Sequence, residues 1–372
     1  MKMKIKNFVK PVAVIGTAAM LISASGCSDT SWSFKTKNKT FTNGGWIYYT
    51  YAALNDAIDK IDEDSDSSFD ITKDDITKKK IEKKDALDWI YDNAKEKAIE
   101  YLTVEKLCND NKLKADKDEI KTMKDNYQSF FDSGYMGIYE QLGISADTFT
   151  DIYGTYNLRY EQLFDFIYGE GGSKEIPDDE ISKYFTENYT SYYYIPYSFK
   201  TTDEDGNETD VDDETKDKVI TDFAKYAKEL NEGKTTDDID TEYKEDFEVE
   251  TSPSVKATTI MSDANVPEDL QKIIEDLGDK KATVKTIDDT HYLVYKGSIS
   301  EEAKALIDGT SENTTVTADT IRHKMKDDEF EKYVDSEEKK LKYEMNDACI
   351  SRYTVQRTID IVKSYTASQS AS

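Results

Sequence analysis

Cysteine, histidine and the acidic residues are the side chains of this sequence that could act as nucleophiles, general bases or metal ligands. The chain has three cysteines and two histidines among 372 residues. It contains no Gly-x-Ser-x-Gly turn, no His-Glu-x-x-His helix, no phosphate-binding glycine loop and no Cys-x-x-Cys pair. The 77 acidic residues could supply a carboxylate pair for glycoside hydrolysis, but no spacing singles one out. We therefore expect no metal site and no cofactor.

The first cysteine, Cys27, follows a leader-like segment. Residues 1–10 are basic, and residues 11–23 are apolar or small but too few to span a bilayer permanently. The segment ends in Ala24-Ser25-Gly26-Cys27, which resembles a bacterial lipobox. We expect residues 1–26 to be a lipoprotein signal peptide. Lipidated Cys27 would then anchor the protein to the extracytoplasmic face of the cell membrane. An ordinary signal peptide that leaves Cys27 as a free thiol is the alternative.

The other two cysteines, Cys108 and Cys349, fall on predicted helices beside apolar residues. Two cysteines make neither a disulfide framework nor a zinc site. Two buried thiols are the simplest interpretation, and a single bridge in an oxidising compartment is the other.

The charge balance excludes some partners. The net charge is −28, and the leader holds four lysines and no acidic residue, so the chain that follows it is more acidic still. Such a surface argues against binding nucleic acid or attaching to anionic lipid by charge alone. The 26 tyrosines and 14 phenylalanines indicate a folded protein, which the excess charge keeps soluble.

One acidic loop has a partial calcium pattern, with aspartates at Asp62, Asp64 and Asp66. Ser67 stands where such a loop needs glycine, and Lys73 stands where it needs a bidentate glutamate. A solvated acidic loop is therefore expected here.

Helical periodicity dominates residues 44–190. Apolar residues spaced by three or four predict helices over 44–61, 85–109 and 116–132, with Phe130 on the inward side of the third. Gly143 and Ser145 have the residue types of a helix C-terminus and of an N-cap. The next helix carries an inward stripe of Phe149, Ile152, Tyr156, Tyr160, Leu163 and Ile167.

The pattern then changes. Residues 191–199 read as a strand, residues 214–231 as a helix and 267–277 as a short helix, with further strands near 258–261, 282–286 and 290–296. Beyond residue 297 we expect a helix over 301–307, a long helix over 320–348, a helix over 350–362 and a disordered tail at 365–372.

Two segments resemble the secreted foldases related to SurA and PrsA. The turn is Leu142-Gly143-Ile144-Ser145-Ala146-Asp147-Thr148-Phe149, and the helix start is Pro177-Asp178-Asp179-Glu180-Ile181-Ser182-Lys183-Tyr184-Phe185. The resemblance implies an α+β, mostly α, fold. After a tether and first strand (27–43), a helical chaperone domain (44–190) would be completed by C-terminal helices (298–364). A parvulin-like domain (191–297) would be inserted between them.

The catalytic residues of a parvulin-type peptidyl-prolyl isomerase are not matched. Such domains use two histidines, but the first strand here has Tyr192-Tyr193-Tyr194 and no histidine. On the last strand the hydrophobic register puts Tyr292 at the histidine position and His291 one residue earlier, on the other face. His291 and Tyr292 are therefore weak catalytic candidates. We expect a degenerate isomerase domain, with retained weak activity as the alternative.

The resemblance implies a membrane-anchored chaperone whose partners are unfolded or nascent secreted polypeptides, bound by exposed aromatic patches. The alternative is a surface lipoprotein that binds a ligand or glycan. A homodimer is left open, and no nucleic-acid partner is expected. The candidate peptide-binding residues are Tyr192, Tyr194, Phe223, Met261 and Tyr292.

Overall fold

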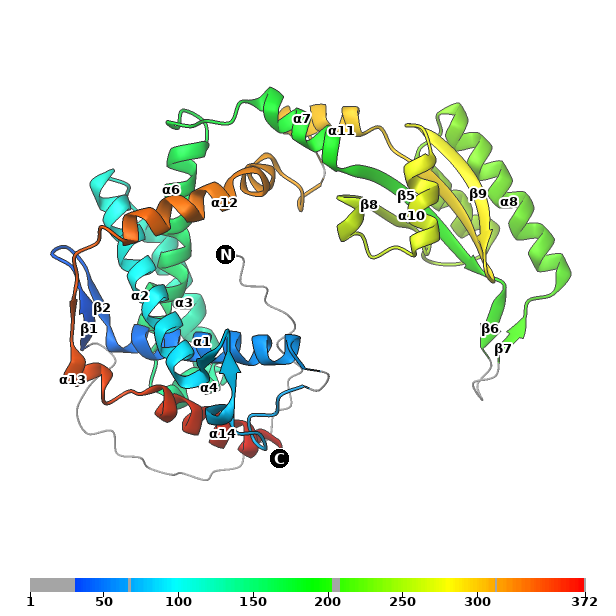
Figure 1. Ribbon diagram of the computed structural model, residues 1–372. Helices are drawn as coiled ribbons and strands as arrows, with labels where there is room; N and C mark the ends of the chain where they lie inside the picture. Colours follow the sequence, from blue (N-terminus) through cyan, green and yellow to red (C-terminus); the bar gives the residue numbers. More distant parts are fainter. Residues whose placement is uncertain (1–30, 66–67, 203–207, 312, 371–372) are drawn as a thin grey trace. The chain divides into compact units, whose positions relative to one another are not determined.

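The computed structural model describes residues 31–65, 68–202, 208–311 and 313–370. The expected class, an α+β fold that is mostly helical, is confirmed (Figure 1). The chain divides into two compact units. Unit 1 comprises the residues up to Glu175 together with those from Lys326 onward, and unit 2 comprises Ile176–Met325. The leader with Cys27, and Asp66 and Ser67 of the acidic loop, lie outside the described residues.

Unit 1 is mainly helical. Helix α1 begins after Thr42, whose side chain accepts a hydrogen bond from the amide of Gly45, as an N-cap should. The helices that precede the division are α1 (Asn43–Glu63), α2 (Ala86–Asp110), α3 (Lys117–Asp132), α4 (Gly137–Leu142), α5 (Ala146–Phe149) and α6 (Tyr156–Tyr168). A π-helical turn (Thr150–Thr155) joins α5 to α6, and a short hairpin of β3 (Lys80–Ile81) and β4 (Lys84–Asp85) precedes α2.

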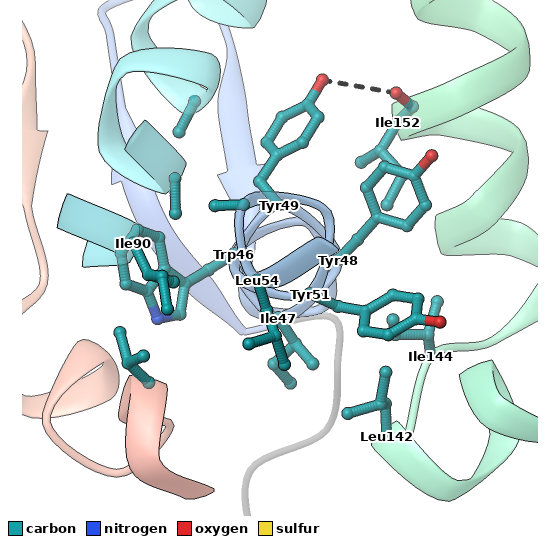
Figure 2. Packing of buried hydrophobic residues seen from close by; sticks show 14 of the residues in the cluster. Trp46, Ile47, Tyr48, Tyr49, Tyr51, Leu54, Ile90, Leu142, Ile144 and Ile152 are labelled. Atoms are coloured by element: carbon teal, nitrogen blue, oxygen red, sulfur yellow. Dashed lines mark hydrogen bonds between the residues drawn. The ribbon is translucent and has the colours of Figure 1, made fainter. Parts of the chain in front are cut away.

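The core of unit 1 surrounds α1. Figure 2 looks along this helix, with Trp46, Tyr48 and Tyr49 directed to different neighbours. Trp46 is completely buried, and the Tyr49 hydroxyl donates to the carbonyl of Ile152 in the π-helical turn at 3.4 Å. Many of the tyrosines, phenylalanines and tryptophans of the sequence therefore lie in the core of this unit, where their rings contribute both buried area and edge-to-face contacts.

The C-terminal segment completes the same core. Strand β11 (Glu344–Met345) pairs antiparallel with β1 (Trp32–Lys35), which also pairs with β2 (Thr40–Thr42). The Trp46 indole donates to the carbonyl of Tyr353 at 3.0 Å. Helices α13 (Asp347–Ile350) and α14 (Val355–Ser370) add four buried apolar residues to the cluster around α1, namely Ile350, Val355, Ile359 and Val362.

Three expectations for unit 1 are corrected. The long helix expected over 320–348 ends earlier, as α12 (Ala318–Glu338), because the chain must extend to pair β11 with β1. The tail expected to be disordered is helical through Ser370, with Ser368 and Ser370 bonded back to carbonyls of the same helix. Phe130 is 48% exposed and Phe131 is buried in its place, because the inward stripe of α3 advances by four residues after Tyr127.

Unit 2 contains a four-stranded antiparallel sheet in the order β8-β5-β10-β9. Its strands are β5 (Thr190–Ser198), β8 (Val255–Thr259), β9 (Lys281–Ile287) and β10 (Thr290–Lys296). Helices α8 (Asp213–Glu232) and α9 (Thr236–Asp246) contribute to the core on one face, and α10 (Glu268–Asp276) to the core on the other (Figure 1). A hairpin of β6 (Lys200–Thr202) and β7 (Glu208–Asp210) follows β5.

The division between the units differs from the boundaries expected at residues 190 and 298. Helices α7 (Asp178–Asn188) and α11 (Ile299–Ile307) pack against each other within unit 2, and the second division falls inside α12. Helix α11 is attached to the sheet of unit 2 through Glu302, whose carboxylate accepts hydrogen bonds from Ser191 on β5 and from Thr258 on β8.

Candidate functional site

Strand alternation sorts the candidate residues of unit 2 onto two faces. In the β5–β10 pair, Val294 lies opposite Tyr194, and Tyr292 lies opposite Pro196. Because successive side chains of a strand point to opposite faces, Tyr192, Tyr194 and Tyr292 share the α10 side. His291 lies on the α8 side.

Four of the five candidate peptide-binding residues meet on the α10 side. We call Tyr192, Tyr194, Met261 and Tyr292 the tyrosine face. Tyr192 and Met261 are buried, at 5% and 7% exposed, and pack with Leu270 of α10 in one apolar cluster. Tyr194 and Tyr292 are only partly buried, so they are the members that a ligand can reach.

The rings of the tyrosine face form a connected series. The Tyr192 and Tyr194 rings are stacked with centroids 6.1 Å apart, and the Tyr194 and Tyr292 rings meet edge to face at 6.1 Å. Such contacts fix the ring orientations before any ligand binds. The partly exposed rings of Tyr194 and Tyr292 offer apolar contact surface to a ligand.

The hydroxyls of Tyr192 and Tyr194 keep their protons near neutral pH. Burial, followed by the neighbouring Tyr194, raises the pKa of Tyr192. Burial, followed by Tyr292, raises the pKa of Tyr194. A protonated phenol can donate a hydrogen bond to a carbonyl oxygen but cannot act as a general base. The tyrosine face is therefore suited to binding rather than to proton transfer.

Phe223 does not belong with the other candidates. It is completely buried on α8, where its ring packs against Tyr226 at 6.1 Å and Tyr243 at 6.2 Å on the opposite side of the sheet. The hypothesis that it contacts the same ligand as Tyr194 is wrong, because the sheet separates them. Residues of α8 followed helical periodicity in the sequence, which indicates a buried stripe as readily as a binding surface.

His291 is a core residue of the α8 side. Its ring stacks on Phe199 at 5.8 Å and lies 5.5 Å from Phe223, and its Nδ1 is 2.8 Å from the Thr286 hydroxyl. Burial lowers its pKa. Its Nε2 is buried and has no hydrogen-bond partner among the described residues. The imidazole therefore cannot serve a ligand on the tyrosine face.

We expect His291 to make unit 2 less stable in acid. Its folded-state pKa lies below the value of about 6.5 for a free histidine, so the unfolded chain binds the proton first as pH falls. This contribution to stability is fully present above about pH 6.5 and is lost below it. Urea unfolding of His291→Phe should show a smaller drop between pH 7.5 and pH 5 than the wild type does. The control Phe247→Leu, in the same apolar cluster but without a titratable group, should retain the wild-type drop.

The two cysteines of the described chain are buried thiols that form no disulfide with each other. The Cys108 thiol donates to the carbonyl of Arg159 at 3.3 Å, and the Cys349 thiol donates to the Asn43 side chain at 3.1 Å. Burial raises the pKa of Cys108 to about 11, so it is not an activated nucleophile. No group of three potential metal ligands was found among the described residues.

Exposed aromatic surface is scarce in unit 1. Over the parts of the chain that the structure describes, the large hydrophobic residues that are exposed are Phe130, Tyr135, Phe166, Ile220 and Val249. Ile220 lies on the outer side of α8, whose buried residues are Val219, Phe223, Tyr226, Ala227 and Leu230. The aromatic residues of unit 1 thus lie mainly in its core rather than in the exposed aromatic patches expected from the sequence. No described helix combines the length and the hydropathy that crossing a membrane would require.

Comparison with known proteins adds weak structural likeness. The sequence matches no protein-family model and no curated protein. Among solved structures, the foldase protein PrsA from Streptococcus pneumoniae is similar over 63% of this chain and 81% of its own, at 17% identity and a TM-score of 0.24. PrsA from Bacillus subtilis is similar over 73% of this chain and 87% of its own, at 14% identity and a TM-score of 0.24. Similarity at this level assigns no activity to the chain.

Proposed function

We propose that this protein is a lipid-anchored, extracytoplasmic chaperone whose tyrosine face binds segments of unfolded secreted polypeptides. The observation that carries the proposal is the meeting of Tyr192, Tyr194 and Tyr292 on one sheet face above buried Met261. Tyrosine rings provide rigid contact area at a low entropic cost, and their hydroxyls can donate to peptide carbonyls. A partly exposed surface of this kind favours weak, sequence-tolerant binding.

The same geometry argues that prolyl isomerisation is lost. The resemblance to parvulins implies histidines on β5 and β10, and those positions on the tyrosine face hold tyrosines. His291 is held on the other side of the sheet between phenylalanine rings. We infer a domain that keeps a peptide-binding surface and lacks the imidazole groups of the enzyme.

The place of action is inferred from the leader alone. Its basic start, its short apolar stretch and the Ala24-Ser25-Gly26-Cys27 site favour export and lipidation at Cys27. Tethering beside the site where unfolded chains emerge from the membrane would raise the effective concentration of a weak binder, so modest affinity is sufficient.

The double variant Tyr194→Ala/Tyr292→Ala should bind unfolded polypeptide at least about tenfold more weakly, because truncating two aromatic contacts typically costs more than about 1.4 kcal/mol of binding free energy. Fluorescence anisotropy with labelled, reduced and carboxymethylated lactalbumin measures the affinity. The matched control is Tyr197→Ala/Tyr295→Ala, which removes two half-buried tyrosines from the same strands on the opposite face. Equal affinity of the two double variants would rule out the tyrosine face as the binding surface.

Two further measurements on the same proteins distinguish the chaperone from an isomerase and from a glycan-binding module. Uncatalysed prolyl exchange takes tens of seconds, so a tetrapeptide assay should show no acceleration by the wild type. Acceleration that is lost in the tyrosine-face variant would restore an enzymatic role. Binding of soluble cell-wall glycan fragments, with no binding of unfolded polypeptide, would instead support a glycan-binding module.

A further inference from the structure

Strand β9 forms one edge of the sheet in unit 2, with a neighbouring strand, β10, on one side only (Figure 1). At the two ends of the β5–β10 pair, the Gly297 amide donates to the carbonyl of Ser191, and the Phe199 amide donates to the carbonyl of Asp289. In an antiparallel sheet successive residues bond to opposite sides, so even-numbered residues of β10 bond to β9. The β9–β10 register pairs them with odd-numbered residues of β9. The even-numbered residues of β9 therefore direct their amides and carbonyls outward.

Ala282, the first of these outward residues, shows what this edge can bind. Its amide donates to Oδ1 of Asn231 at 3.0 Å, and its carbonyl accepts from Nδ2 of Asn231 at 3.0 Å. Asn231 lies near the end of α8. A carboxamide presents the same kind of donor and acceptor as a peptide group, so this side chain takes the place of a neighbouring strand. At this position the edge already holds a group with the chemistry of a polypeptide backbone.

Val284 and Thr286 are the other two outward residues of β9. In the parts of the chain that the structure describes, no hydrogen bond reaches the outward amide or carbonyl of either residue. Thr286 is exposed, and so is Lys285 between them, whereas Val284 is half-buried. Unpaired and accessible backbone groups on an edge strand are a template for another extended chain.

We propose that the edge of β9 at Val284 and Thr286 binds an extended segment of unfolded polypeptide by strand addition. Strand addition rests on the proposed chaperone function and states how the polypeptide is held. The bonds would be made by backbone amides and carbonyls, which unfolded segments offer whatever their sequence. Because side chains alternate along a strand, half of those on the added strand would lie on the side of the sheet that carries the tyrosine face.

A second copy of this chain fits the edge less well. The net charge of −28 opposes the association of two copies. The lysines of β9, Lys281 and Lys285, are exposed, and charged side chains of this kind discourage permanent pairing between edge strands. Two outward residues also offer few hydrogen bonds, which suits a transient complex with an unfolded chain.

Strand β8 is the other edge of the sheet and serves as the comparison. The same alternation directs the backbone groups of Lys256 and Thr258 outward. The side chains of both residues contact helices: Lys256 lies 3.6 Å from Asp237 of α9, and Thr258 donates to Glu302 of α11. Strand β9 is longer, and its outer residues include the exposed Thr286, so we assign the polypeptide to β9.

Amide exchange of the full chain, measured by solvent-exchange NMR, tests strand addition. In the free protein the outward amides of Val284 and Thr286 should exchange fast. With reduced, carboxymethylated lactalbumin at ten times its Kd, both should exchange about tenfold more slowly, because mainly the free fraction of the protein exchanges. Thr283 and Lys285 are the internal control: their amides already bond to β10, so their exchange should not change.

The variant Val284→Pro removes one outward amide and leaves the bonds to β10 in place, a change that edge strands tolerate. Its affinity for the labelled lactalbumin, measured by fluorescence anisotropy, should be at least about threefold weaker than that of the wild type. The matched control Lys256→Pro removes an outward amide from β8 and should keep the wild-type affinity. Wild-type protection of the β10 amides in both variants shows that the sheet is intact. If Val284→Pro does not fold, the exchange measurement on the wild type decides the question.

The failures of strand addition and of the chaperone function are distinguishable. Unchanged exchange at Val284 and Thr286 while lactalbumin binds would overturn strand addition and leave the tyrosine face as the binding surface. Weaker binding by Lys256→Pro than by Val284→Pro would overturn it in favour of β8. Protection that rises with the concentration of the protein alone would overturn it in favour of a second copy. No binding of lactalbumin at all would overturn the chaperone function and strand addition together.

Discussion

A chain that ends at Lys340 is expected to lose the folded structure of unit 1 and to keep that of unit 2. The deletion removes β11, the partner of β1, and with it the bond from the Asn346 amide to the carbonyl of Ser33 at 2.8 Å. It also removes the four buried residues Ile350, Val355, Ile359 and Val362.

The free energy lost with these side chains explains why partial folding of unit 1 is not expected. Burying one such side chain contributes about 1.5–3 kcal/mol, so four contribute about 6–12 kcal/mol. That range is comparable with the whole stability of a typical domain, about 5–15 kcal/mol. The loss of the carbonyl of Tyr353 would further leave the Trp46 indole without the acceptor that it now has in the core.

Hydrogen exchange resolved by segment measures the outcome. Amides of α1 and α2 should lose protection in the shortened chain, whereas amides of β5 and β10 should keep it, because unit 2 has apolar clusters of its own. A chain shortened only after Thr366 is the control, since it removes an exposed last turn and leaves Val362 in place. Unchanged protection of α1 in the longer deletion would show that the C-terminal segment is an appendage.

Much of this architecture could be predicted from local signals. Gly143 has φ +80°, the left-handed conformation in which glycine ends helices, and the Ser145 side chain caps α5 by accepting from the amide of Thr148. The strand expected over 290–296 is β10, Thr290–Lys296. These features depend on residues that are close together in the sequence, so the type of a single residue is enough to predict them.

Pairings between distant segments could not be predicted in the same way. Strand β11 has only two residues, too few for a period-two pattern, and it forms because β1 offers an unpaired edge. Alternation correctly separated His291 from Tyr292, but it could not show that Phe223 lies on the side of His291, because that depends on which face α8 covers.

A buried ion pair in unit 1 is another pairing between distant residues that could not be predicted from the sequence. Glu105 of α2 and Arg159 of α6 lie 3.5 Å apart, with side chains only 8% and 6% exposed. The guanidinium also donates to the carbonyl of Leu113 at 2.7 Å and to the Asn109 side chain at 3.2 Å. In the sequence each was one charged residue among many, and nothing marked them as partners.

Arg159→Met is expected to cost unit 1 about 3–5 kcal/mol of unfolding free energy, because among the described residues it leaves the buried Glu105 carboxylate with one ion-pair partner, Lys39 at 3.9 Å. Urea unfolding followed by near-ultraviolet circular dichroism measures the loss. Adding Glu105→Leu should recover much of it, since replacing both partners removes the unpaired charge and fills the space. Lys106→Met is the matched control on α2: its pair with Asp110 is exposed and should be worth less than about 1 kcal/mol. A double variant no more stable than Arg159→Met would show that the guanidinium acts mainly through Leu113 and Asn109 rather than through Glu105.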